Sequence, residues 1–150
     1  MPQTNTLAEY RHTQVMGMSQ AELVVMLYQG ATRFLHEAIG LLHAERYDRS
    51  WQKFDRARRI LTHLYGTLNP SAGELSGKLA SLYAYLIDQI TVANAHRDIK
   101  LTEDCIQILT TLKEGWEQLA LQGRANAIAD IKDRTETERA PVAQACCFQA

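Results

Sequence analysis

The sequence has little proline and no long apolar run. Only three of its 150 residues are proline, at positions 2, 70 and 141. Because proline breaks helix interiors, the gaps between these positions leave room for long helices. The longest strongly apolar stretch, Leu23 to Tyr28, is far shorter than the roughly 20 residues that a spanning helix needs. We therefore expect no membrane insertion.

Cysteines are also few. Cys105 falls inside a helical pattern, and Cys146 and Cys147 are adjacent near the end of the chain. An odd number of cysteines without regular spacing does not form a disulfide framework. The N-terminus has no apolar core of the kind found in secretory signals. Both observations predict a chain that stays in the cytoplasm.

Charge of neither sign dominates. Lys and Arg number 16 against 17 Asp and Glu, for a formal net charge of −1. This balance argues against a protein that mainly neutralises phosphates, so we expect no nucleic-acid partner. A basic stripe is interrupted by acidic residues, and pairs four residues apart favour a solvated face. The stripe consists of Arg46, Arg49, Lys53, Arg56 and Arg59.

The sequence has no recognisable catalytic or metal-binding pattern. The one Glu-x-x-His spacing, Glu9 to His12, precedes the predicted helices, whereas a di-iron bundle needs two on facing helices. The segment at His36 begins like a zinc-protease motif, but Gly40 replaces its second histidine. No glycine-rich phosphate loop or activated nucleophile is present. We expect a protein that is not an enzyme and that has no metal or cofactor.

Apolar residues recur at spacings of three and four, which is typical of helices. Ser19 is the expected N-cap of the first helix, because Glu22 follows as in a capping box. Thr102 is the expected N-cap of the fourth, after a break at residues 97–101. The predicted helices span residues 19–44, 48–68, 74–96 and 102–122.

Each predicted helix has an apolar stripe that we expect to form the core. The first two stripes are Leu23, Leu27, Ala31, Phe34, Ala38 and Leu42, and Trp51, Phe54, Ala57, Leu61, Leu64 and Leu68. The other two are Leu75, Leu79, Leu82, Leu86, Ile90 and Ala93, and Leu101, Cys105, Ile108, Leu112, Trp116 and Leu119.

Four helices of this length with short connections predict an all-α fold, an antiparallel up-down four-helix bundle. We divide the chain into an N-terminal arm (1–18), the helical bundle (19–122) and a weakly helical extension (123–150). Residues 124–135 are rich in alanine and allow a short fifth helix. The last fifteen residues are expected to be a flexible tail.

Two segments have more apolar surface than one buried stripe requires. Leu23 to Tyr28 is apolar over more than a full turn, and the third helix is apolar well beyond its stripe. One interpretation is that other parts of the chain bury these helices on all sides. The other is an exposed apolar groove that binds amphipathic helices of a partner.

Several motifs occur in a fixed order along the chain. They are Tyr10 followed by Val15, LYQGATRFL at 27–35, LNPSAGEL at 68–75, LYAYL at 82–86 before Ala93-Asn94, and LKEGWEQL at 112–119. The set resembles the flagellar secretion chaperone FliS family. Gln29 stands where the family usually has Asp, Ala72-Gly73 replaces Gly-Gly, and Ala84 lies where Asp is common.

The resemblance implies a cytosolic export chaperone. Such a protein binds the C-terminal segment of flagellin, prevents premature polymerisation and aids delivery to the flagellar type III export apparatus. Export gate components or an anti-sigma factor are further partners under this interpretation. The alternative is a helical adaptor or co-chaperone for another flagellar regulator or export protein. An exposed groove also allows weak homodimers.

The resemblance places the partner-binding surface on the second, third and fourth helices. For each leucine the alternative is ordinary core, whereas Tyr83 and Trp116 offer large contact areas at low entropic cost. Residues of the arm are expected to cover the groove in the free protein, with a hydrophobic staple or a frayed helix end as the alternatives. The candidates are Tyr10, Val15, Leu61, Leu64, Leu68, Leu79, Leu82, Tyr83, Leu86, Ile90, Asn94, Ile108, Leu112 and Trp116.

Overall fold

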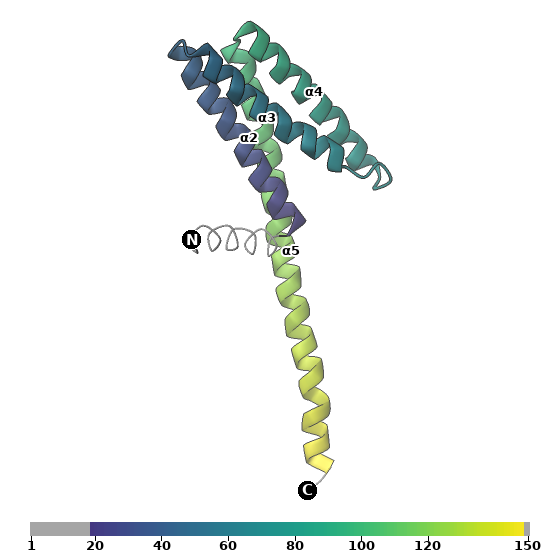
Figure 1. Ribbon diagram of the computed structural model, residues 1–150. Helices are drawn as coiled ribbons and strands as arrows, with labels where there is room; N and C mark the ends of the chain where they lie inside the picture. Colours follow the sequence, from purple (N-terminus) through teal and green to yellow (C-terminus); the bar gives the residue numbers. More distant parts are fainter. Residues whose placement is uncertain (1–18, 149–150) are drawn as a thin grey trace, which may run out of the picture.

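The computed structural model describes the backbone of residues 19–148 and the side chains of residues 19–135. This part of the chain contains four helices and no strand. Consecutive helices pack against each other, and the first also packs against the last. The predicted all-α up-down bundle is therefore confirmed (Figure 1). The helices are α2 (Gln20–His43), α3 (Tyr47–Thr67), α4 (Glu74–His96) and α5 (Ile99–Phe148).

Helix α2 begins at the predicted capping box. The backbone N–H of Glu22 donates to Ser19 Oγ at 3.2 Å, and the backbone N–H of Ser19 donates to Glu22 Oε2 at 3.1 Å. These two bonds satisfy donors that have no partner within the helix. No described helix combines the length and apolarity that crossing a membrane requires.

The predicted N-cap at Thr102 is wrong. Helix α5 begins at Ile99, and the carboxylate of Asp98 accepts the backbone N–H of Leu101 at 3.0 Å. Thr102 lies inside the helix, is fully buried, and donates its hydroxyl to the Asp98 carbonyl at 2.7 Å. The chain turns more tightly than expected because Arg97 adopts a left-handed conformation with φ of 53°.

Helix α5 has 50 residues and continues past Gly123 without a break. Its length is about 75 Å at 1.5 Å per residue. Residues 124–135 therefore prolong the fourth helix and do not form a fifth one. A single glycine costs a helix only about 1 kcal/mol relative to alanine, and the surrounding alanines favour continuation.

The core differs from the predicted stripes at several positions. In α2, Tyr28 and Leu35 are fully buried, whereas the predicted Leu27 and Phe34 are only partly buried. Since apolar residues are adjacent at both places, either could have faced inward. Seven further residues that the stripes placed in the core are only partly buried: Leu23, Leu68, Leu82, Leu101, Ile108, Leu112 and Trp116.

Three predicted core residues are exposed: Trp51 by 58%, Leu75 by 61% and Leu119 by 49%. Next to Trp51, Ser50 is buried instead, and its hydroxyl donates to the Ala38 carbonyl at 3.4 Å. Helices α2 and α3 approach each other there on small side chains, so an indole has no room.

Asp55 of α3 is mostly buried and accepts hydrogen bonds from Arg58 and Arg59, each at 2.7 Å. The bond from Arg58 is the main reason why the pKa of this carboxyl lies below its usual value. Its contribution to stability is therefore present above the pKa of the unfolded chain and is lost as the pH falls through the folded pKa.

We predict that Asp55→Asn lowers the free energy of unfolding by up to about 1 kcal/mol at neutral pH. The deficit should shrink as the pH falls below the ordinary aspartate pKa of about 4. It should vanish only below the lowered pKa of the folded state, where the wild-type carboxyl is also protonated. Urea unfolding at pH 7 and pH 3 measures this, with the exposed Asp88→Asn as control. An equal deficit at both pH values contradicts the prediction.

Candidate functional site

Helix α2 packs against both α3 and α5, and α4 packs mainly against α3. Toward the turn between α3 and α4, this helix pair diverges from the pair formed by α2 and α5 (Figure 1). A cavity of about 350 Å³ lies between the diverging pairs. We call it the fork cavity. It is lined by Gln20, Val24, Leu64, Thr67, Leu68, Asn69, Ala72, Leu75, Ser76, Leu79, Tyr83 and Trp116.

The walls of the fork cavity are largely apolar and come from every helix of the bundle. Helices α3 and α4 contribute Leu64, Leu75 and Leu79, the residue that follows α3 contributes Leu68, and α5 contributes Trp116. Leu75 stands at the mouth and is 61% exposed. Among the described residues, no Asp, Glu, Lys or Arg lines the cavity. Such a surface suits an apolar segment of a partner rather than a charged ligand.

A hydrogen-bonded pair of tyrosines lies at the bottom of the cavity. Tyr83 lines the cavity, and its hydroxyl is hydrogen-bonded to the hydroxyl of Tyr28 on α2. Both side chains are almost completely buried, with ring centroids 6.3 Å apart and planes tilted by 53°. Burial is the main cause that raises the pKa of each phenol above its ordinary value. Both hydroxyls therefore stay neutral under ordinary conditions.

The turn at the rim is held by its own hydrogen bonds. The Asn69 side-chain oxygen accepts the backbone N–H of Ser71 at 3.1 Å, and the Asn69 carbonyl accepts the Ser76 hydroxyl at 2.7 Å. Gly73 then has φ of 99°, which side chains rarely allow. The motif at 68–75 thus builds a fixed rim for the cavity.

The structure brings together five of the predicted partner-binding residues around the fork cavity. They are Leu64, Leu68, Leu79, Tyr83 and Trp116. The others lie elsewhere: Leu61, Leu86 and Ile90 are buried core, and Leu82, Asn94, Ile108 and Leu112 are partly buried. Tyr10 and Val15 fall outside the residues that the structure describes.

Sequence reasoning missed the part of the site that α2 supplies. Gln20 and Val24 line the fork cavity from the first two turns of that helix. Their only signal in the sequence is the excess of apolar residues that begins at Leu23. Leu75 was assigned to the core, but it lies in the first turn of α4, where the helix pairs have already separated.

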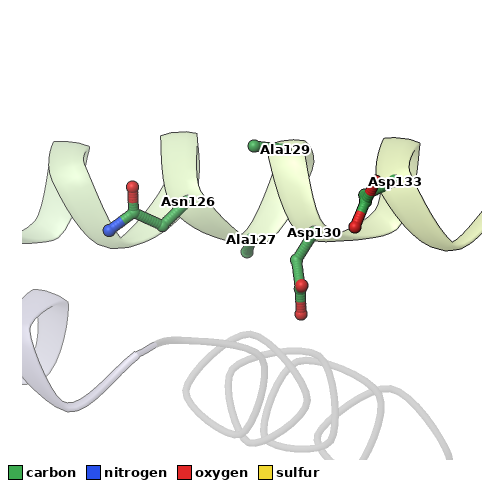
Figure 2. Close-up of a pocket in the computed structure, with 5 residues that line it drawn as sticks. All are labelled: Asn126, Ala127, Ala129, Asp130 and Asp133. Atoms are coloured by element: carbon green, nitrogen blue, oxygen red, sulfur yellow. The ribbon is translucent and has the colours of Figure 1, made fainter.

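A larger hollow is lined, among the described residues, by α5, and these residues define no site by themselves. Its described lining is Asn126, Ala127, Ala129, Asp130 and Asp133, all from one helix (Figure 2). Figure 2 shows Ala129 on the opposite side of the helix from Ala127 and Asp130. Side chains that point apart cannot enclose a ligand. Among the described residues, no three His, Cys, Asp or Glu side chains are grouped to hold a metal.

Comparison with known proteins gives a consistent result. The profile of a family described as flagellar protein FliS matches residues 3–123. The flagellar secretion chaperone FliS of Bacillus subtilis is 25% identical over 114 residues, 76% of this chain and 85% of that protein. FliSB of Pseudomonas aeruginosa is 29% identical over 108 residues, 71% of this chain and 86% of that protein.

A solved structure described as a flagellar chaperone from bacteria shares the fold. Its TM-score is 0.65 at 21% identity, and the match covers 81% of this chain and 99% of the other. The architecture is thus an all-α bundle with an open apolar cavity, of the class found in flagellar chaperones. The family match extends over most of the sequence, and this chain belongs to the FliS family of flagellar secretion chaperones.

We predict that Tyr83→Phe lowers the free energy of unfolding by about 1–3 kcal/mol, because the buried Tyr28 hydroxyl loses its partner. The double variant Y28F/Y83F should cost clearly less than the sum of the two single variants, since it leaves no unpaired hydroxyl. Urea unfolding measures all three. The matched control is Tyr85→Phe on the exposed face of α4. Additive costs contradict the prediction.

Proposed function

We propose that this chain binds the C-terminal segment of flagellin in the cytosol, blocks its premature polymerisation and delivers it to the type III export gate. The fork cavity is the main observation that supports this proposal. It is apolar, open at one end and bounded by a fixed turn, as a receptor for an amphipathic segment requires. Family membership supports the choice of flagellin as the partner.

The fork cavity is too small to hold a whole helical segment, so the contact must extend along the bundle. Ile108, Leu112 and Trp116 follow each other on α5 at helical spacing and are only partly buried. Leu82 and Asn94 of α4 are also partly exposed. A segment anchored in the cavity and lying along α4 and α5 would cover these residues. Buried candidates such as Leu61 and Leu86 would support this surface from below.

The N-terminal arm is joined to the chain beside the cavity. It joins α2 at Ser19, next to Gln20, which lines the cavity, and one turn before Val24, which also does. Val15 and Tyr10 precede Gln20 by five and ten residues along the chain. We propose that these two side chains occupy the cavity in the free protein and that flagellin displaces them.

Calorimetric titration tests the function. A flagellin C-terminal peptide of about 50 residues should bind with saturable 1:1 stoichiometry and a negative heat-capacity change, because apolar surface is buried as the peptide folds. Measurement at two temperatures gives that change, and flagellin without the segment is the control. Absence of binding at tens of micromolar contradicts the proposal.

Leu75→Lys should weaken flagellin binding about tenfold or more, because it removes an apolar contact and places a charge at the cavity mouth. Stability should change little, since Leu75 is already exposed. The matched control is Trp51→Lys, which alters an exposed side chain near the start of α3, whereas Leu64 and Leu68 lie at its other end. If the two variants bind flagellin with equal affinity, the cavity is not part of the binding site.

Deletion of residues 1–15 tests the arm. We expect tighter flagellin binding, because the peptide no longer competes with Tyr10 and Val15 for the cavity. The free protein should also become less stable, because the deletion removes Tyr10 and Val15 from the cavity that they are proposed to occupy. Unchanged affinity together with an unchanged urea midpoint would contradict a capping role.

A further inference from the structure

Positive charge gathers on the outer side of the seam between helices α2 and α3, which lie side by side (Figure 1). The Arg33 guanidinium of α2 lies 5.2 Å from the centroid of the Phe34 ring. The Lys53 ammonium and the Arg56 guanidinium of α3 lie 5.5 and 5.6 Å from the same centroid. An aromatic ring attracts cations, but three like charges around one ring also repel each other. We call Arg33, Phe34, Glu37, Lys53 and Arg56 the basic seam.

Glu37 is the carboxylate that faces these cations. Its oxygens lie 2.5 Å from Lys53 Nζ and 3.9 Å from Arg33 Nε. The pKa of Glu37 lies below its ordinary value, mainly because of its bond to Lys53, and the charges of Arg33 and Arg56 lower it further. Arg56 forms no ion pair with any described residue. The basic seam therefore has three positive charges against one negative charge.

The basic stripe seen in the sequence is divided in the structure. Arg59 is bonded to Asp55 at 2.7 Å, and Arg58 is bonded to the same carboxylate. Asp55 thus neutralises arginines that follow it on its own helix. Lys53 and Arg56 instead approach Phe34 of α2. A solvated face of paired charges accounts for Arg59, but it does not account for the excess charge at the seam.

A hollow of about 340 Å³ adjoins the basic seam on the side of α2 that faces α5. Arg33 and Glu37 belong to both the seam and the hollow, and α5 adds Lys113. Glu117 pairs with Lys113 only loosely, at 3.8 Å. The surface across α2 therefore offers four cations, and the hollow leaves room for an acidic side chain between two of them.

We propose that the basic seam binds an acidic segment of a protein other than flagellin, one with two or three carboxylates beside an apolar side chain. A guanidinium pairs with a carboxylate through two parallel hydrogen bonds, and both Arg33 and Arg56 offer one. Phe34 is only partly buried, so its ring is available to the apolar side chain. The positive charge of the seam complements such a segment.

The basic seam faces away from the surface assigned to flagellin. Helix α2 packs between α3 and α5, and α3 packs between α2 and α4. The outer side of the α2–α3 seam is therefore opposite the edge formed by α4 and α5. The choice of a partner other than flagellin rests on the proposed function, which places flagellin in the fork cavity and along that edge. Both partners can then bind one chain at the same time.

The charge distribution favours an acidic polypeptide over a nucleic acid. The chain as a whole has a net charge of −1, so a long polyanion is repelled by the rest of the surface. A short acidic segment presents its carboxylates to the seam alone. Its apolar side chain also gains a contact with Phe34 that a phosphate backbone does not offer.

Fluorescence anisotropy of a labelled helical peptide tests the seam on the full chain. The peptide has three glutamates at helical spacing around one leucine, and its control has glutamine at the same positions. We expect a dissociation constant on the order of tens of micromolar at low salt. Raising the salt to about 300 mM should weaken binding at least about fivefold, because exposed charges are screened. Absence of binding, or equal binding of the glutamine peptide, overturns the proposal.

Variants of the seam test its location. R33Q/R56Q should bind the glutamate peptide about tenfold more weakly than the wild type, because both guanidinium groups are lost. The matched control K78Q/K132Q removes two positive charges from exposed lysines of α4 and α5 and should bind like the wild type. The reversed variant R33E/R56E should instead bind a peptide with lysines in place of the glutamates. Equal weakening by both glutamine pairs would mean that only net charge matters, and it overturns the site.

Binding with flagellin present separates this inference from the proposed function. Saturating flagellin peptide should leave the affinity for the glutamate peptide within about twofold, and R33Q/R56Q should bind flagellin like the wild type. Competition between the two peptides overturns the separate site. Tighter binding of a single-stranded oligonucleotide than of the glutamate peptide overturns the choice of an acidic protein segment. If flagellin does not bind but the glutamate peptide does, the proposed function fails and the basic seam stands.

Discussion

The hydrogen bond between the hydroxyls of Tyr28 and Tyr83 joins the two halves of the bundle where they begin to separate. One tyrosine belongs to the α2–α5 pair and the other to the α3–α4 pair. Both side chains are almost completely buried, so each hydroxyl needs a partner within the protein. The pair sets how far the helices can diverge and forms the floor of the fork cavity.

The size of the core side chains explains why the bundle opens at one end. At the closed end the helices meet on Ala38, Ser50 and Ala93, which are nearly or fully buried and allow close approach. Toward the fork, the interior holds two tyrosines and the partly buried Trp116. Bulky aromatic groups keep the helix pairs apart, and the space beyond them becomes the fork cavity. The site is thus a direct consequence of how the core is packed.

Helix α5 lies in two different environments along its length. Within the bundle it buries Thr102, Cys105, Ile106 and Leu109. Beyond Gly123 no second helix of the bundle accompanies it, yet its sequence retains large aliphatic residues at helical spacing. The first part belongs to the fold that the FliS family shares, and the second part is additional to it.

The sequence by itself determined the helical class, the capping box at Ser19, the turn at 68–75 and the resemblance to FliS. These depend on local spacing, backbone conformation and short motifs. It also identified Leu64, Leu68, Leu79, Tyr83 and Trp116, which meet at the cavity. Only the tertiary structure decided which of two adjacent apolar residues faces the core, as at Leu27 and Tyr28, because both satisfy the same helical period. It likewise decided that Leu75 is exposed and that α5 continues, since those outcomes depend on where neighbouring helices end.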